Sequence, residues 1–180
     1  FRYLTLTQGG ASNQDAADLR ITIEPDKDAH LLIIRDNGIG MTRDELVSNL
    51  GTIARSGSLE FIRNLRQSEN SDADVSLIGQ FGVGFYSAFM LADRVEVYTR
   101  SHSETQGWVW ESVGDGNYSI AELSEPVERG TQIRLHLKKG LEEFTDPVRL
   151  KYVLRKYSTF VPHAIYLSDE HINNQPPIWV

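Results

Sequence analysis

Apolar and polar residues alternate over residues 19–24, which is the period of a strand with one buried face. The continuous apolar run over residues 31–34 is typical of a strand that is buried on both faces. Residues 25–28, with the sequence Pro-Asp-Lys-Asp, supply turn-forming residues between the two runs. The pattern therefore predicts a hairpin over residues 19–34.

Helical signals follow this hairpin. Thr42 and Glu45 have the spacing of a capping box, in which each side chain accepts a hydrogen bond from the other residue's backbone N–H. Gly51 is a natural stop signal for that helix. Ser58 predicts the cap of a second helix, whose apolar stripe consists of Leu59, Ile62 and Leu65. Residues 67–74 are polar and predict a surface loop.

The later part of the chain is rich in strands, after a glycine-rich loop that turns into a buried helix over residues 79–92. Partial alternation predicts strands over residues 94–99, 108–112, 118–123 and 132–137. Asp146 and Pro147 open a helix in the favoured order of cap, then proline. Its apolar positions follow the helical repeat and predict a packed face: Leu150, Val153, Leu154 and Tyr157. Residues 164–167 predict a last strand.

These elements together predict an α+β fold, a two-layer α/β sandwich with a mostly antiparallel sheet and helices on one face. The short turns between the later strands favour hairpins over βαβ crossovers. A length of 180 residues suits one domain, which we place over residues 1–172. Pro176 and Pro177 suggest that residues 173–180 begin a linker toward another domain.

Composition narrows the class of function. The chain carries 18 basic and 25 acidic residues, and the resulting net charge of -7 disfavours a nucleic-acid partner. It contains no cysteine, which excludes disulfides and thiolate sites and suits a cytoplasmic location. No apolar run approaches the roughly 20 residues of a membrane helix. The five histidines are scattered without metal-ligand spacing, and there is no nucleophile elbow.

A carboxylate followed by glycines ends the buried strand of the predicted hairpin. An ionised Asp36 only accepts hydrogen bonds, so its natural partner in a pocket is a donor such as the exocyclic amine of adenine. Residues 36–38, Asp-Asn-Gly, are also good turn formers, and a plain turn is the favoured explanation when this segment is taken alone. Thr131, after Gly130, has a hydroxyl that can complete such a pocket, although threonine is also a common strand residue.

Glycines gather in two further segments. Residues 79–87, Gly-Gln-Phe-Gly-Val-Gly-Phe-Tyr-Ser, precede an apolar helix, so their backbone N–H groups can point at an anion. The segment is not a Walker A loop, because no Lys-Ser/Thr follows, and Ser87 replaces the last glycine of a dinucleotide fingerprint. Residues 50–57 place Arg55 among glycines and hydroxyl side chains, which suits phosphate contact, although a helix end followed by a cap also explains this segment.

Taken in order, residues 36–41, 50–57, 79–87 and 130–131 resemble the nucleotide-binding motifs of the GHKL superfamily. This superfamily contains the ATPase component of DNA gyrase, the ninety-kilodalton heat-shock chaperones, sensor histidine kinases and MutL. Residues 50–57 and 78–88 are most similar to the chaperones, and among them to the bacterial members. The resemblance covers nearly the whole chain. It implies the Bergerat fold, with the N-terminal strand and helix of that fold absent from this chain.

For the adenine base, the resemblance implies roles for four residues. Asp36 would accept a hydrogen bond from the adenine amino group, with the help of an ordered water and Thr131. Gly40 and Met41 would line the base pocket. The implied ligands are ATP and ADP.

For the ribose and phosphates, the resemblance implies that Asn49 and Arg55 lie near these groups. The family usually has lysine at the position of Arg55, so a planar guanidinium replaces a point charge there. The backbone amides offered to the phosphates would be those of Gly82, Val83, Gly84 and Phe85. Residues 56–80 resemble the lid that closes over bound ATP, with glycines at both ends as hinges.

The resemblance also implies a departure. In the family, an earlier helix supplies a glutamate that activates water and an asparagine that holds Mg²⁺, and no residue here matches either role. Residues 1–4 resemble the end of that helix. We therefore expect an ATPase activity of the full-length protein, producing ADP and phosphate, but no meaningful hydrolysis by this chain. General-base catalysis alone contributes ~10²–10⁴-fold.

The function that the resemblance implies is that of an ATP-dependent chaperone, whose partners are client proteins and a second copy of the full-length chain. ATP binding and hydrolysis would drive a cycle of lid and dimer conformations. The alternative is another GHKL module, of the histidine kinase, MutL or DNA gyrase type. A kinase would need a phospho-acceptor histidine domain and a topoisomerase a basic DNA-handling region.

Overall fold

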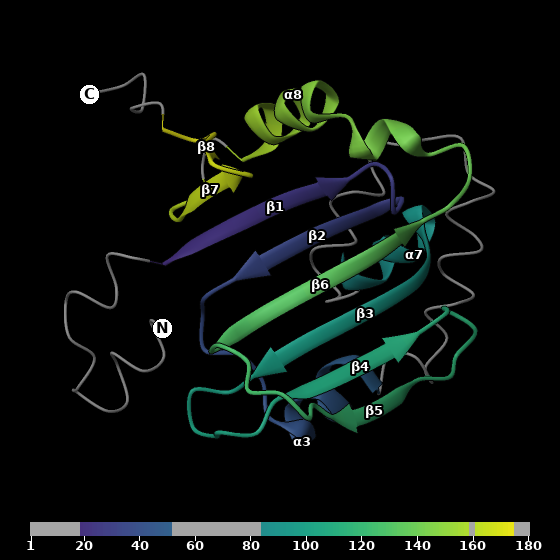
Figure 1. The fold of residues 1–180 in the computed structure, drawn as a ribbon, viewed down its shortest axis with the longest axis vertical. Helices are drawn as coiled ribbons and strands as arrows, with labels where there is room; N and C mark the ends of the chain where they lie inside the picture. Colours follow the sequence, from purple (N-terminus) through teal and green to yellow (C-terminus); the bar gives the residue numbers. More distant parts are fainter. Residues whose placement is uncertain (1–18, 52–83, 159–160, 175–180) are drawn as a thin grey trace.

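The computed structural model describes residues 19–51, 84–158 and 161–174. The eight strands of the described residues form one sheet in the order β5-β4-β3-β6-β2-β1-β7-β8 (Figure 1). Their bounds are β1 Arg20–Asp26, β2 Leu31–Asp36, β3 Ala92–Arg100, β4 Trp108–Ser112, β5 Ser119–Glu122, β6 Gly130–Leu137, β7 Ala164–Leu167 and β8 Glu170–His171.

The helical segments are short, apart from one near the C-terminal end. The α-helices are α3 Arg43–Leu46, α7 Ala88–Leu91 and α8 Pro147–Tyr157. A π-helical turn, η1 Val47–Gly51, continues α3, and the 3-10 turns are η2 Gly84–Ser87 and η3 Glu142–Thr145. The predicted helix after Ser58, the loop over residues 67–74 and residues 79–83 of the glycine-rich loop lie outside the described residues.

The predicted hairpin and the mostly antiparallel sheet are confirmed. β1 and β2 pair antiparallel, and β6 lies between β2 and β3, antiparallel to both. The pairing of β1 with β7, the strand that follows α8, is parallel. The strand predicted over residues 164–167 is confirmed as β7, but it is not the last strand, since the two-residue strand β8 turns back to pair with it.

The start of α3 follows the predicted capping box. Thr42 N donates to Glu45 Oε2 at 2.8 Å, and Glu45 N donates to Thr42 Oγ1 at 3.2 Å. Leu46 and Leu50 point from α3 and η1 into the core and are 0% and 7% exposed. The two reciprocal hydrogen bonds therefore fix the start of α3, the first element of the helical layer after β2.

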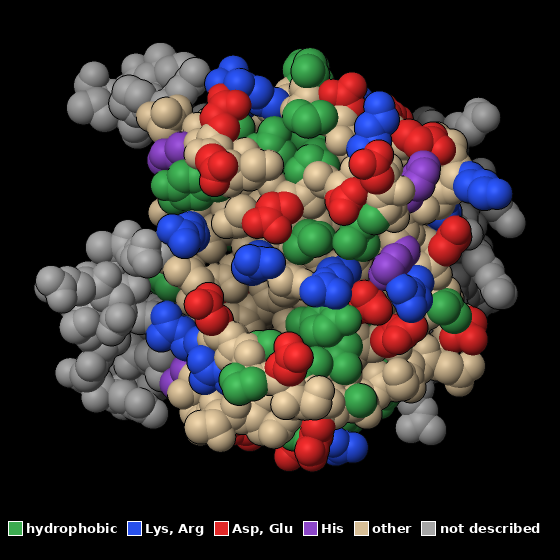
Figure 2. Space-filling model, in the orientation of Figure 1, with side chains coloured by type: hydrophobic (Ala, Val, Ile, Leu, Met, Phe, Trp, Pro, Cys, Tyr) green, Lys and Arg blue, Asp and Glu red, His purple; other side chains and the backbone are tan. Residues whose placement is uncertain are grey.

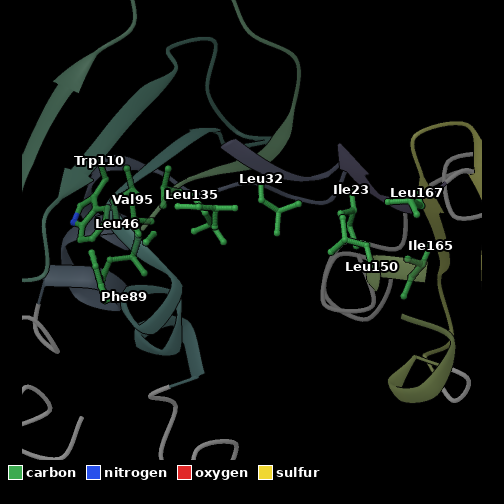
Figure 3. Packing of buried hydrophobic residues seen from close by; sticks show 14 of the residues in the cluster. Ile23, Leu32, Leu46, Phe89, Val95, Trp110, Leu135, Leu150, Ile165 and Leu167 are labelled. Atoms are coloured by element: carbon green, nitrogen blue, oxygen red, sulfur yellow. The ribbon is translucent and has the colours of Figure 1, made fainter. Parts of the chain in front are cut away.

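The core lies between the sheet and the helical segments. α3 and α7 lie behind the sheet in Figure 1, so these described helices cover one face, as predicted. Figure 3 shows one row of buried side chains that runs from Trp110, beside Leu46 and Phe89, to Leu150 and Ile165. The opposite face of the sheet carries the alternate, mostly polar positions of the same strands.

α8 covers the end of this core that lies beneath β1 and β7. Leu150 is buried and Leu154 packs against the core, as its helical repeat predicts. The predicted packing of Tyr157 is wrong, because this side chain is 71% exposed. It is the last residue of the helix, and Lys156 Nζ lies 5.0 Å from the centre of its ring.

Asp146 is expected to stabilise α8 through its side chain, which accepts hydrogen bonds from Val148 N at 2.7 Å and Arg149 N at 3.4 Å. The substitution Asp146→Ala should lower the free energy of unfolding by about 1 kcal/mol, because both donors lose their acceptor. Urea unfolding measures the change. The conservative variant Asp146→Ser should retain most of the lost stability, and equal losses in both variants would contradict the capping role.

Candidate functional site

Three neighbouring strands bring three polar residues together at one end of the sheet. Asp36 in β2 is paired in register with Thr131 in β6, and Thr131 is paired with Thr99 in β3. Because side chains alternate along strands, this row lies on the same face as the buried positions of β3, β6 and β2. The row therefore faces the helical layer. We call these three residues, Thr99, Thr131 and Asp36, the polar row.

The environment of Asp36 opposes its ionisation on balance. Burial raises the pKa of this carboxyl above its ordinary value of 3.8, which is the largest effect. Hydrogen bonds from the backbone of Gly38 and of Thr131 act in the opposite direction and lower the pKa. Gly38 N donates to Asp36 Oδ1 at 2.8 Å and fixes the orientation of the carboxylate. When ionised, the group is a half-buried acceptor with no proton to donate.

The hydroxyl of Thr99 connects three separate segments of backbone. Its Oγ1 donates to Gly130 O at 2.8 Å and accepts from Met41 N at 2.9 Å. Since its one proton is used on Gly130, Thr131 must be the donor in the 3.3 Å contact between the two hydroxyls. The Thr131 oxygen then offers lone pairs beside the Asp36 carboxylate. The polar row therefore presents acceptors and is complementary to a ligand that donates.

Two glycines let these segments approach each other. Gly40 has a φ of +63°, and a Cβ on it would lie 1.9 Å from the carbonyl oxygen of Arg100. Gly130 has a φ of +125°, and a Cβ on it would lie 2.1 Å from the carbonyl oxygen of Asp36. Side chains are therefore excluded from both positions by strain and by contact. Removing either glycine would force apart the backbones that hold the polar row.

The structure brings together four of the predicted base-site residues. Asp36 and Thr131 are register partners, Gly40 lies against the strand end that carries Thr99, and Met41 is tied to Thr99 and packs against the core. The four residues therefore lie close together, as expected for one pocket. Their roles in binding remain predictions.

The predicted phosphate-site residues belong to the helical layer where they are described. Asn49 is exposed on η1, which continues α3, and Gly84 and Phe85 begin η2, which leads into α7. The ring of Phe85 meets Trp110 edge to face, with ring centres 5.6 Å apart. Arg55, Gly82 and Val83 lie outside the described residues.

Thr99 organises the site, although no sequence motif singles it out. It is 2% exposed within a predicted strand, where threonine is a common residue. Only the register between β3 and β6 places its hydroxyl beside Thr131. The pairing of Thr99 with Thr131 at a strand end would have pointed to this role, but the sequence alone does not reveal which strands pair.

Residues 11–141 match the family model described as histidine kinase-, DNA gyrase B- and HSP90-like ATPase. The chain belongs to this ATPase family. The match includes all ten predicted site residues, and the resemblance drawn from the motifs is confirmed at the level of the family.

Curated relatives of this ATPase share nearly half of its residues. The chain is 45% identical over 179 residues to a protein named chaperone protein HtpG from Desulfitobacterium hafniense, covering 99% of this chain and 29% of the relative. A protein of the same name from Rickettsia bellii is 46% identical over 174 residues, covering 97% and 28%. A third, from Pseudoalteromonas translucida, is 51% identical over 166 residues, covering 92% and 25%. The chain thus spans between a quarter and three tenths of their length.

Metal-binding clusters are absent from the part of this ATPase that the structure describes. Within residues 19–51, 84–158 and 161–174, no group of three or more histidine, aspartate or glutamate side chains is placed to hold a metal ion. None of the described helices is long and apolar enough to cross a membrane.

Proposed function

We propose that the chain binds ATP and ADP, with the adenine base at the polar row. The observation that carries the proposal is the half-buried Asp36 carboxylate, held by Gly38 N at 2.8 Å beside the acceptor oxygen of Thr131. Adenine offers an exocyclic amine with two protons, which matches a pair of neighbouring acceptors, one of them contacted through a water. Membership of this ATPase family supports the same ligand.

The remaining predicted contacts complete the proposed site. Gly40 and Met41 would border the base, because the hydrogen bond from Met41 N to Thr99 holds this segment against the polar row. Asn49 and Arg55 would lie toward the ribose and phosphates. The backbone amides of Gly82, Val83, Gly84 and Phe85 would meet the phosphate oxygens at the start of η2 and α7. Mg²⁺, when bound, would neutralise charge on the phosphates.

For the whole protein we propose an ATP-operated chaperone with a lid over residues 56–80, client proteins and a second copy as partners. The relatives named chaperone protein HtpG support this part, and this chain spans 25–29% of their length. Asp36 is the one carboxylate that we assign to this site, and its proposed role is to hold the base.

Calorimetric titration with ADP and with inosine diphosphate tests the base contact directly. The two ligands differ at purine position 6, where inosine has a carbonyl acceptor in place of the amine. Facing Asp36, this acceptor should weaken binding by at least about tenfold, because two acceptors cannot share a hydrogen bond. Equal affinities would place the base elsewhere and reject the proposed site.

The affinity for ADP is expected to rise with pH through the pKa of Asp36 and then to level off. The ionised carboxylate is a stronger acceptor for the amine than the protonated carboxyl group. Burial raises the pKa of Asp36 above 3.8, so the fall in affinity should begin above that ordinary value. Titrations between roughly pH 4.5 and 8 measure the slope. The Asp36→Asn variant controls for titration of the ligand, and an unchanged slope in that variant would remove Asp36 from the explanation.

A further inference from the structure

Thr99 lies behind the other two members of the polar row. Its side chain is 2% exposed, whereas Asp36 and Thr131 are partly exposed. Figure 2 shows the opposite face of the sheet, where acidic and basic side chains are intermixed, and the polar row points away from that face. A ligand at the polar row therefore meets Asp36 and Thr131, and Thr99 acts on it through these neighbours.

The hydroxyl group of Thr99 has its whole hydrogen-bonding capacity in use. Its Oγ1 donates to Gly130 O at 2.8 Å, accepts from Met41 N at 2.9 Å and lies 3.3 Å from Thr131 Oγ1. A hydroxyl group has one proton and two lone pairs. Because Gly130 takes the proton and Met41 one lone pair, the second lone pair is left for the proton of Thr131.

The proton of Thr131 is thereby directed away from Asp36. β6 lies between β3 and β2, so Thr99 and Asp36 flank Thr131 from opposite sides. A proton that points toward Thr99 leaves lone pairs of the Thr131 oxygen on the side of Asp36. Thr131 then leaves the carboxylate oxygens of Asp36 to a ligand, and it adds a further acceptor beside them.

We propose, on the basis of the proposed function, that Thr99 is a positioning residue that makes the site prefer a purine with an amino group at position 6. Thr99 holds the proton of Thr131 and so keeps both side chains that face the ligand as acceptors. Without Thr99, that proton turns toward the ligand. There it opposes the protons of the amine, or it occupies an oxygen of Asp36 that the amine needs.

A purely structural role of Thr99 predicts a different pattern of losses. Its hydroxyl also ties Gly130 and Met41 to β3, so its removal loosens the backbone around the polar row. A loosened pocket would bind purines with and without the amino group more weakly by the same factor. Loss of the acceptor arrangement weakens only the purine that donates at position 6, so the ratio of the two affinities separates the two roles.

Calorimetric titration of the intact protein with ADP and with purine riboside diphosphate measures this ratio. The second ligand has a hydrogen atom in place of the 6-amino group and is otherwise the same as ADP. The parent protein should prefer ADP by at least about tenfold, as expected for a hydrogen bond to a charged group. Thr99→Val should reduce this preference by about fivefold, the contribution of one neutral hydrogen bond.

Thr99→Ser should retain the preference of the parent protein, because serine keeps the hydroxyl group. Thr22→Val is the matched control, since Thr22 is a partly exposed threonine of β1 outside the polar row, and it should leave both affinities unchanged. Thermal unfolding shows which variants are folded at the assay temperature. Thr99→Cys, whose thiol is a weak hydrogen-bonding group, gives the same test should the valine variant fail to fold.

Substitution of Thr131 tests the route of the effect. In a protein that already carries Thr131→Val, the further substitution Thr99→Val should leave the preference for ADP unchanged, because no Thr131 proton remains to be held. A further fall in the preference would overturn the proposal. An unchanged ratio in Thr99→Val alone would also overturn it and would leave the proposed function standing. Equal binding of the two ligands by the parent protein would instead reject the proposed function itself, and the role of Thr99 with it.

Discussion

The substitution Asp36→Asn should weaken ADP binding by about 1–3 kcal/mol, or roughly 5- to 150-fold. The carboxylate is half-buried and held in place by Gly38 N. A base that loses this acceptor would therefore have to leave its position to find another one, which weakens binding. Asparagine keeps the shape but replaces one acceptor oxygen by an NH₂ group. Either this donor faces the adenine amine, or the side chain turns and places it toward Gly38 N. Calorimetric titration with ADP measures the loss.

Asp28→Asn is the control for this substitution, because Asp28 is exposed on the turn of the same hairpin. It should leave ADP affinity unchanged. The Asp36→Asn protein should be at least as stable as the parent near neutral pH. Burial raises the folded-state pKa of Asp36, so its ionised form costs stability at pH values above that pKa. A variant that unfolds, or one that binds as tightly as the parent, would contradict the assignment.

The substitution Gly130→Ala is expected to destabilise the protein by about 2–4 kcal/mol and to impair ADP binding as well. The φ of +125° is a region that residues with a side chain rarely adopt, and the new Cβ would stand 2.1 Å from Asp36 O. It would also lie 3.0 Å from the Cα of Asn37. Both obstacles are backbone atoms, so relief requires β2 and β6 to separate where Asp36 and Thr131 meet. Chemical denaturation measures the first effect and titration with ADP the second.

Gly140→Ala separates strain from contact. Gly140 also has a positive φ, +86°, but nothing lies within 4 Å of the position that its Cβ would occupy. It should cost only the backbone strain, about 1 kcal/mol, and leave ADP affinity unchanged. Comparable losses of stability in the two variants would show that the close approach at Gly130 contributes little.

Local chemistry was sufficient to predict most elements of the fold. The alternation in β1, the turn over residues 25–28 and the capping box at Thr42 each depend on neighbours within a few residues. The same holds for Asp146 and Pro147 at the start of α8. Motif resemblance led us to expect Asp36 and Thr131 in one pocket, and the structure places them opposite each other in the pairing of β2 with β6, which had not been predicted.

Features that depend on distant contacts were missed or mistaken. Thr99 belongs to the site only because β3 pairs with β6, which no local pattern indicates. The parallel pairing of β1 with β7 joins segments that are far apart in sequence. Tyr157 follows the apolar repeat of α8, yet the helix ends there and the ring points into solvent.

The order of the sheet has a consequence for how such a domain can diverge. β3, β6 and β2, which carry the polar row, occupy the middle of the sheet, with β5 and β8 at its margins (Figure 1). Insertions and replacements at the margins leave the middle strands paired on both sides. Extra chain attached to the edge strands therefore leaves in place the central pairing that sets Asp36, Thr131 and Thr99 side by side.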